Sequence, residues 1–152
     1  ANLAQTVNVL QAVILTRGEK LILTPTYHVM EMYKVHQDAI LIPVQTVSRD
    51  FIFGDKRIPA ISVSASLDSK GKMHISLTNL DNKNDQKVEL DVRGYPAKKV
   101  SGRILTSAKV QDHNTFDNPV KVSPKSFSNA TLAGNRVNLS MPPGSVIVLE
   151  LE

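Results

Sequence analysis

The chain has 152 residues, of which 41% are hydrophobic and 21% are charged, and its formal net charge is +4. These values are typical of a globular protein and exclude a disordered chain, and no apolar run reaches the length of a membrane span. Because the lysines are scattered among acidic residues without interleaved aromatic residues, we expect neither a nucleic-acid nor a membrane partner. The absence of cysteine excludes a disulfide framework and a thiolate ligand, and it leaves the cellular compartment open.

The first residues, Ala1 to Thr16, are too continuously apolar for an exposed arm, so we expect them to be buried. Residues 12–16 and 21–24 are β-favouring runs on either side of a short polar connection that contains Gly18, and they predict a hairpin. The chain opens without a basic leader, and we expect it to be cut from something longer.

Residues 24–39 predict a helix. Thr24 can accept hydrogen bonds from the first turn, and Pro25 suits the next position because its missing N–H is not needed there. The predicted apolar face has Tyr27, Met30 and Lys34 on one ridge, with Val29, Met32, Tyr33 and His36 beside it. We expect that the rest of the chain does not supply a partner for this face.

From Ile40 onward the pattern predicts strands alone. These are residues 40–44, 61–67, 73–77, 88–92, 98–107, 120–122, 135–141 and 145–151. We expect the second, third and fourth of them to form an antiparallel meander, with a hairpin turn at Asp81–Asp85, and we expect a long polar loop at Gln111–Pro119. The fold class is therefore mainly β, a jelly-roll or Greek-key β-sandwich.

The two parts of the chain are unlike each other. Residues 40–152 form the predicted sandwich domain, whereas residues 1–39 do not make a complete layer with its own core. The helix face must then be covered either by the sandwich, through Tyr27, Met30 and Tyr33, or by a second chain. We favour a homo-oligomer, because a closed sandwich offers little spare apolar surface.

Candidate chemical groups are sparse. His28, His36, His74 and His113 do not have the spacing of metal ligands, so we expect no metal and no cofactor. The segment Asp81–Asp85 lacks the glycine and terminal glutamate of a calcium loop. No pair of carboxylates suited to acid and base catalysis can be identified, and no serine lies in a nucleophile motif.

A stand-alone β-sandwich module that binds polysaccharide or protein is an alternative from a different class. The chain has no tryptophan, and only Tyr95, Phe116 and Phe127 could decorate the later loops, which argues against a sugar platform. The polar loop at residues 112–118 could still recognise a partner.

The segments ANLAQTVNVLQAVILT, TPTYHVMEMYKVHQDA and LIPV resemble the end of the catalytic barrel in α-L-arabinofuranosidases of glycoside hydrolase family 51. The segments SASLDSKGKMHISLTNLD and NRVNLSMPPGSVIVLEL are similar to the C-terminal jelly roll of that family. The resemblance implies that residues 1–5 end the eighth strand of a (β/α)8 barrel, that the hairpin is the following loop, and that the helix is the last barrel helix. It also implies a retaining parent enzyme that releases terminal arabinofuranosyl units from arabinan or arabinoxylan.

The resemblance implies one site residue. Gln5 matches the glutamine that binds arabinose in the parent enzyme, at the C-terminal end of a barrel strand, where barrel active sites are built. The alternative is a buried glutamine that bonds to backbone in an incomplete core. Both catalytic glutamates belong to earlier barrel strands, Glu19 and Glu31 match neither, and the chain alone should be inactive.

Overall fold

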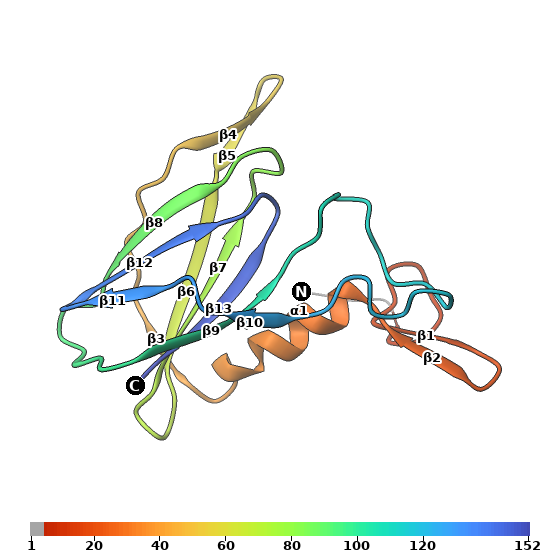
Figure 1. Cartoon of the computed structure of the whole chain (residues 1–152), viewed down its shortest axis with the longest axis horizontal. Coiled ribbons are helices and arrows are strands. Elements are labelled where there is room, and N and C mark those ends of the chain that lie inside the picture. Colours follow the sequence, from red (N-terminus) through yellow and green to blue (C-terminus); the bar gives the residue numbers. More distant parts are fainter. Residues whose placement is uncertain (1–4) are drawn as a thin grey trace.

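The computed structural model describes residues 5–152 (Figure 1). Two antiparallel sheets pack face to face, and a helix covers part of the outer face of the larger one. In spatial order the larger sheet contains β10 (Lys125–Phe127), β9 (Val100–Leu105), β13 (Val146–Leu151), β7 (Met73–Asn79), β6 (Ile61–Leu67) and β3 (Ile40–Ile42). The smaller sheet contains β11 (Thr131–Ala133), β12 (Arg136–Met141) and β8 (Gln86–Asp91). The mainly β fold class predicted from sequence is confirmed.

The main core lies between the two sheets, where alternate residues of each strand point inward. On β12, Val137, Leu139 and Met141 are buried while the residues between them are exposed. Ile147 and Leu149 of β13 meet them from the larger sheet. Gly102 of β9 leaves room for this packing, because a Cβ at that position would lie 2.8 Å from Cδ2 of Leu149.

The predicted meander is wrong. Strand β7 pairs with β6 and β13, whereas β8 pairs with β12 in the smaller sheet. The side chain of Asn79 explains the crossing, because its Nδ2 donates to the carbonyls of Asn84 and Pro142 at 3.0 and 2.9 Å. The segment Asp81–Asp85 is therefore a corner between sheets, not a hairpin turn.

The predicted strand at Val120–Val122 is also wrong. These residues lie in the loop between β9 and β10, and Val122 is buried against the helix instead of pairing in a sheet. Four strands were not predicted from any pattern. They are β10 and β11, which follow this region, and the hairpin of β4 (Asp50–Phe53) and β5 (Lys56–Pro59), which precedes it. Their runs are only three or four residues long, too short for alternation to be recognised.

The N-terminal hairpin is confirmed as β1 (Ile14–Arg17) and β2 (Lys20–Leu23), with Gly18 at φ 59° in the connection. The expectation that residues 1–16 are buried fails for most of the part that the structure describes. Ala12 and Val13 are buried, but Leu10 is exposed, because no element within residues 5–152 covers it. Residues 1–4, which make up most of the barrel-strand end implied for residues 1–5, lie outside the described part.

The helix begins where the sequence predicts, but it ends earlier than predicted. Oγ1 of Thr24 accepts a hydrogen bond from the Tyr27 amide at 3.4 Å and caps α1 (Pro25–Tyr33). A 3₁₀ turn, η1 (Lys34–His36), follows, and the chain leaves it through Asp38, whose φ is 56°. The predicted range to Ala39 was therefore too long.

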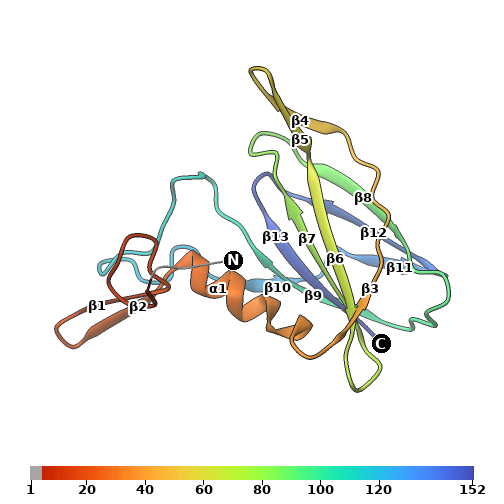
Figure 2. The same cartoon turned by 180° about the vertical axis from the view of Figure 1, so that it is seen from behind.

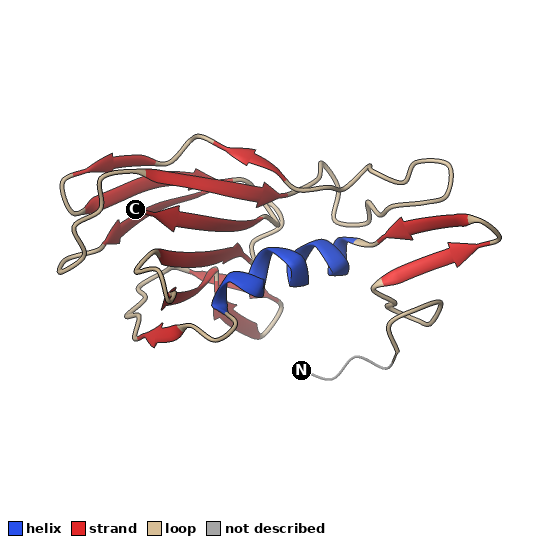
Figure 3. Ribbon diagram, turned by 90° about the horizontal axis from the view of Figure 1, so that it is seen from below, coloured by secondary structure: helices blue, strands red, loops and turns tan. Residues whose placement is uncertain are grey.

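The chain does supply a partner for the helix, contrary to expectation. Met32 is 1% exposed and packs with Leu105, Val122 and Val148, and Val29 and Tyr33 lie beside it. Met30 points outward and is 51% exposed. Figure 3 shows α1 beside the strands of the sandwich, with the β1–β2 hairpin beyond its N-terminal end.

Candidate functional site

The residue implied to bind substrate lies at the start of a closed loop. Gln5 is exposed, so it is not a core glutamine, and its role toward a ligand stays a prediction. The neighbouring carbonyl of Thr6 accepts hydrogen bonds from the amides of Val13 and Ile14, both at 3.0 Å. The backbone next to Gln5 is therefore attached directly to strand β1.

Asn8 closes the loop that follows Gln5. Its φ is 55°, and asparagine tolerates this left-handed conformation better than most residues. Its Nδ2 donates to Oγ1 of Thr16 at 2.7 Å, and its Oδ1 accepts from the Thr16 amide at 2.7 Å. Both ends of β1 are thus bonded to the loop that displays Gln5.

The loop between β9 and β10 supports the hairpin from the other side. Nδ2 of the buried Asn114 donates to the carbonyls of Leu23 and Val122 at 2.8 and 2.9 Å, and its Oδ1 accepts from the Val122 amide at 2.7 Å. The Arg17 guanidinium lies 4.3 Å from the centre of the Phe116 ring. Figure 1 shows this loop beside β1 and β2.

The predicted loop at Gln111–Pro119 is confirmed, but its polar side chains mainly hold it in place. Asp112 accepts from Ser107 at 2.6 Å and pairs with Lys121 at 2.7 Å. These hydrogen bonds, with that from Lys121 first, lower the pKa of Asp112 to about 2. A carboxylate engaged in this way is not available to recognise a separate partner.

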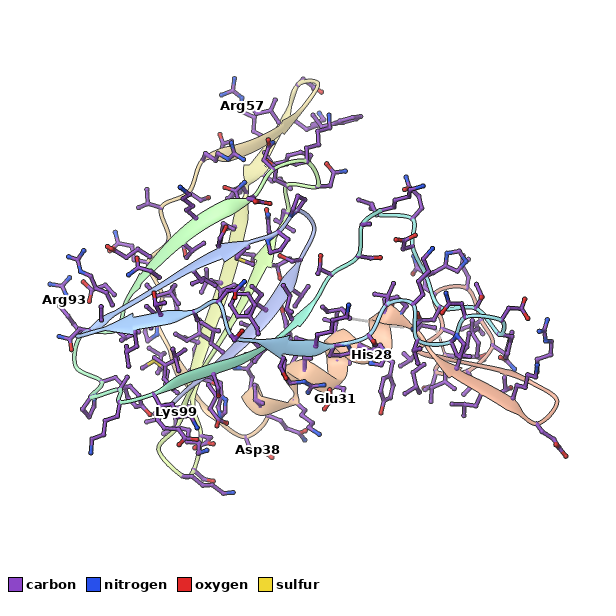
Figure 4. The ribbon with its side chains drawn as sticks, in the orientation of Figure 1. His28, Glu31, Asp38, Arg57, Arg93 and Lys99 are labelled. Atoms are coloured by element: carbon purple, nitrogen blue, oxygen red, sulfur yellow. The ribbon has the colours of Figure 1, made fainter. Side chains whose placement is uncertain are left out.

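Neither glutamate of the first 39 residues is placed for catalysis. Glu19 is exposed at the hairpin tip. Glu31, labelled in Figure 4, pairs with Arg103 at 2.8 Å and Lys34 at 3.3 Å. Burial opposes ionisation of Glu31, but the hydrogen bonds from Arg103 and Lys34 outweigh it and lower the pKa. Glu31 therefore joins the helix to β9.

His36 and His74 lie near each other, but the four histidines do not gather at one place. The ring of His36, on η1, bridges two neighbouring strands of the larger sheet, with Nδ1 2.6 Å from Oγ of Ser66 on β6 and Nε2 2.9 Å from Oγ of Ser76 on β7. Nε2 of His74 lies 3.0 Å from Oδ2 of Asp68. Across residues 5–152, no three histidine or acidic side chains are grouped as a metal site would need. The described helices are also too short to cross a bilayer.

A groove with a volume of about 790 Å³ lies between the sheets, along β8 and the extended segment 43–49. Aliphatic side chains such as Ile61, Ile75 and Val88 line its floor, and Arg49 and Gln86 lie at one end. Among residues 5–152, no aromatic residue lines this groove, so they provide no ring on which a sugar could stack there.

Comparison with known proteins decides the family. Residues 1–145 match the α-L-arabinofuranosidase C-terminal domain. The chain belongs to this family, the C-terminal domain of glycoside hydrolase family 51 enzymes. The intracellular exo-α-L-arabinofuranosidase of Bacteroides ovatus is 40% identical over the whole chain, which spans 30% of the length of that relative.

Solved structures of family 51 enzymes have the same architecture. The arabinofuranosidase from Xanthomonas axonopodis pv. citri is 42% identical, with a TM-score of 0.95 over 98% of this chain and 30% of that one. The enzyme from Thermotoga petrophila RKU-1 is 28% identical, with a TM-score of 0.84 over 100% of this chain and 34% of that one. The resemblance noted in the sequence is confirmed, and the chain is about a third as long as these relatives.

Sequence reasoning missed the residues that hold the site together. Asn8 and Asn114 hydrogen-bond to residues across a loop or far away in the sequence, and Arg17 makes a cation–π contact with the distant Phe116. An asparagine in a polar loop is normally a turn residue, and its type alone does not identify its distant partner.

Proposed function

We propose that this chain is the C-terminal part of a retaining α-L-arabinofuranosidase that removes terminal arabinofuranosyl units from arabinan, arabinoxylan or related oligosaccharides. The observation that carries this proposal is the 40% identity to an exo-α-L-arabinofuranosidase along the whole chain. Residues 1–39 would complete the catalytic barrel and residues 40–152 would form the accessory sandwich. The exposed position of Gln5 on a loop fixed by Asn8 supports a substrate-binding role for Gln5 in the parent enzyme.

In this proposal the sandwich holds the helix and the β1–β2 hairpin in position. It holds α1 through Met32 and through the pair between Glu31 and Arg103, and it holds the hairpin through Asn114. Because a displacement of about 1 Å can cost about a hundredfold in rate, a fixed hairpin matters for a substrate group beside it.

The chain alone should be inactive, because retaining hydrolysis needs an acid/base and a nucleophilic carboxylate, and Glu31 is committed to Arg103. We expect no hydrolysis of an aryl arabinofuranoside by the isolated chain. Turnover that survives repurification would contradict this. In the full-length enzyme, Gln5→Ala should lower kcat/KM by about tenfold or more, since a hydrogen bond to substrate is lost.

The alternative, a stand-alone binding module, has less support. The loop it would use is engaged by Lys121 and Ser107, and the groove between the sheets has no aromatic lining. Affinity electrophoresis in gels containing arabinan or arabinoxylan separates the two proposals. Clear retardation of the isolated chain would favour the binding module, and unchanged mobility is expected for an accessory sandwich.

A further inference from the structure

The contact between Arg17 and Phe116 joins two segments that are far apart in the sequence. Arg17 ends strand β1 and faces Lys20 in the last pair before the hairpin turn, whereas Phe116 belongs to the β9–β10 loop. Figures 1 and 2 show this loop beside the β1–β2 hairpin in both views. The Arg17 guanidinium lies over the Phe116 ring, and such a contact holds the cation without using its N–H donors.

The N–H donors of the Arg17 side chain are free for a ligand. Arg17 is exposed, and among residues 5–152 no carboxylate pairs with it and no acceptor takes a hydrogen bond from its side chain. Arg103 and Arg136, by contrast, each donate to a glutamate at 2.8 Å. A guanidinium that is positioned by a ring and exposed to water is suited to bind oxygen atoms of a ligand.

Arg17 lies along the strand that is bonded beside Gln5. The Ile14 amide at the start of β1 donates to the carbonyl of Thr6, the residue after Gln5. A strand rises about 3.4 Å per residue, so the backbone of Arg17 lies about 10 Å from that of Ile14. One further sugar unit and the arginine side chain can together span this distance from a sugar bound at Gln5.

We propose that Arg17 donates hydrogen bonds to hydroxyl groups of the sugar from which the terminal arabinofuranosyl unit is released, and that Phe116 positions Arg17. This inference rests on the proposed function, in which the hairpin follows the last barrel strand and lies on the barrel face that carries the active site. The nearby charges favour a neutral sugar, because Glu19 and Asp117 in the same two loops balance Arg17 and Lys20. The sandwich would then take part in selecting the leaving group.

The first test compares two substrates of the full-length enzyme, an arabinofuranosyl disaccharide and an aryl arabinofuranoside. Arg17→Met should lower the ratio of kcat/KM for the disaccharide to kcat/KM for the aryl substrate by about tenfold or more, because an aryl group has no sugar hydroxyls to lose. Arg93→Met is the matched control and should leave the ratio unchanged, since Arg93 pairs with Asp91 at the end of the molecule away from the hairpin (Figure 4). An unchanged ratio in Arg17→Met, or an equal loss on both substrates, would overturn the proposal.

The second test concerns the positioning role of Phe116. Phe116→Leu should lower the same ratio, and Phe116→Tyr, which keeps a ring, should retain it. The variant with both Arg17→Met and Phe116→Leu should have the ratio of Arg17→Met alone, because the two residues act as one unit. Additive losses would overturn the positioning role, as would a Phe116→Leu variant that lowers Tm and leaves the ratio unchanged.

The wild-type enzyme separates this proposal from the proposed function. If it hydrolyses neither substrate, the proposed function fails and the role of Arg17 fails with it. If it hydrolyses both and the Arg17 variant keeps the wild-type ratio, only the role of Arg17 fails.

Discussion

Oε2 of Glu31 and Nη1 of Arg103 lie 2.8 Å apart and join helix α1 to strand β9. Glu31 also contacts Lys34 within the helix, and both cations are partly exposed. The helix is therefore attached to the larger sheet by an ion pair at its margin and by Met32 at its centre, and the two contributions are separable.

We expect the ion pair to contribute little. A double-mutant cycle of Glu31→Gln and Arg103→Met, measured by urea denaturation, should give a coupling energy of about 0.5 kcal/mol, because solvent screens partly exposed pairs. The exposed pair of Arg136 and Glu89 in the smaller sheet is a suitable control. A coupling energy above about 2 kcal/mol would show that the ion pair of Glu31 and Arg103, and not Met32, holds the helix on the sheet.

Met32 should dominate the attachment. Met32→Ala removes a buried side chain from the cluster with Leu105, Val122 and Val148, and it should lower the free energy of unfolding by about 2–5 kcal/mol. Met30→Ala on the same helix should change it by less than about 0.5 kcal/mol, because Met30 is mostly exposed. Similar losses in the two variants would mean that the helix packs through a different face.

Stability should fall in mild acid because of His36. Burial, and then the nearby His74, lower the pKa of His36 below its ordinary value of 6.5. The unfolded chain then binds more protons than the folded chain as pH falls below about 6.5, so the folded state loses stability through that range. Stability should be regained as pH rises above it.

The measurement for His36 is the urea midpoint from pH 7.5 to 5. His36→Gln should flatten part of the pH dependence, because the uncharged amide cannot take up a proton. His113→Gln, in the exposed part of the β9–β10 loop, should leave the profile of the wild type unchanged. A profile that His36→Gln does not alter would assign the acid sensitivity to other groups.

Asn114 should keep the β9–β10 loop ordered where that loop supports the β1–β2 hairpin. Asn114→Ala leaves the buried Val122 amide without its acceptor, at a cost of about 1–3 kcal/mol. Hydrogen exchange at Val122 should become faster, and kcat/KM of the full-length enzyme should fall. Asn118→Ala, at an exposed position of the same loop, should affect neither. Unchanged protection at Val122 would contradict this role for Asn114.

Regular alternation was the reliable signal in the sequence. Ile61–Leu67 alternates cleanly and is strand β6. The run SVIVLEL is apolar at successive positions, and both faces of β13 are in fact covered, Ile147 in the main core and Val148 under the helix. A run that is apolar at successive positions indicates a strand covered on both faces. The sequence of β13 therefore indicates that something covers the outer face of the sheet, and the expectation of an uncovered helix did not take this into account.

Partners distant in the sequence were not predictable in the same way. A period of two indicates the two faces of a strand but not its neighbour, so the sequence order suggests β7 beside β8, whereas β8 pairs with β12. Val120–Val122 has the composition of a strand, but Val122 lies in a loop. There its amide donates to Asn114 and its side chain packs with Met32. Gln5 was located through family resemblance, because nothing in its local pattern distinguishes it from any other polar residue.

Strand β13 lies between β7 and β9 in the larger sheet, although it is the last of the three to be made on the ribosome. Until it emerges, β7 and β9 have no neighbour between them and their inward residues have no completed layer. The nascent sandwich therefore cannot close progressively from its first strands. Chaperones that shield unpaired strand edges would act on this protein until β13 has emerged, and a chain truncated before residue 146 would keep a sheet with an open gap at its centre.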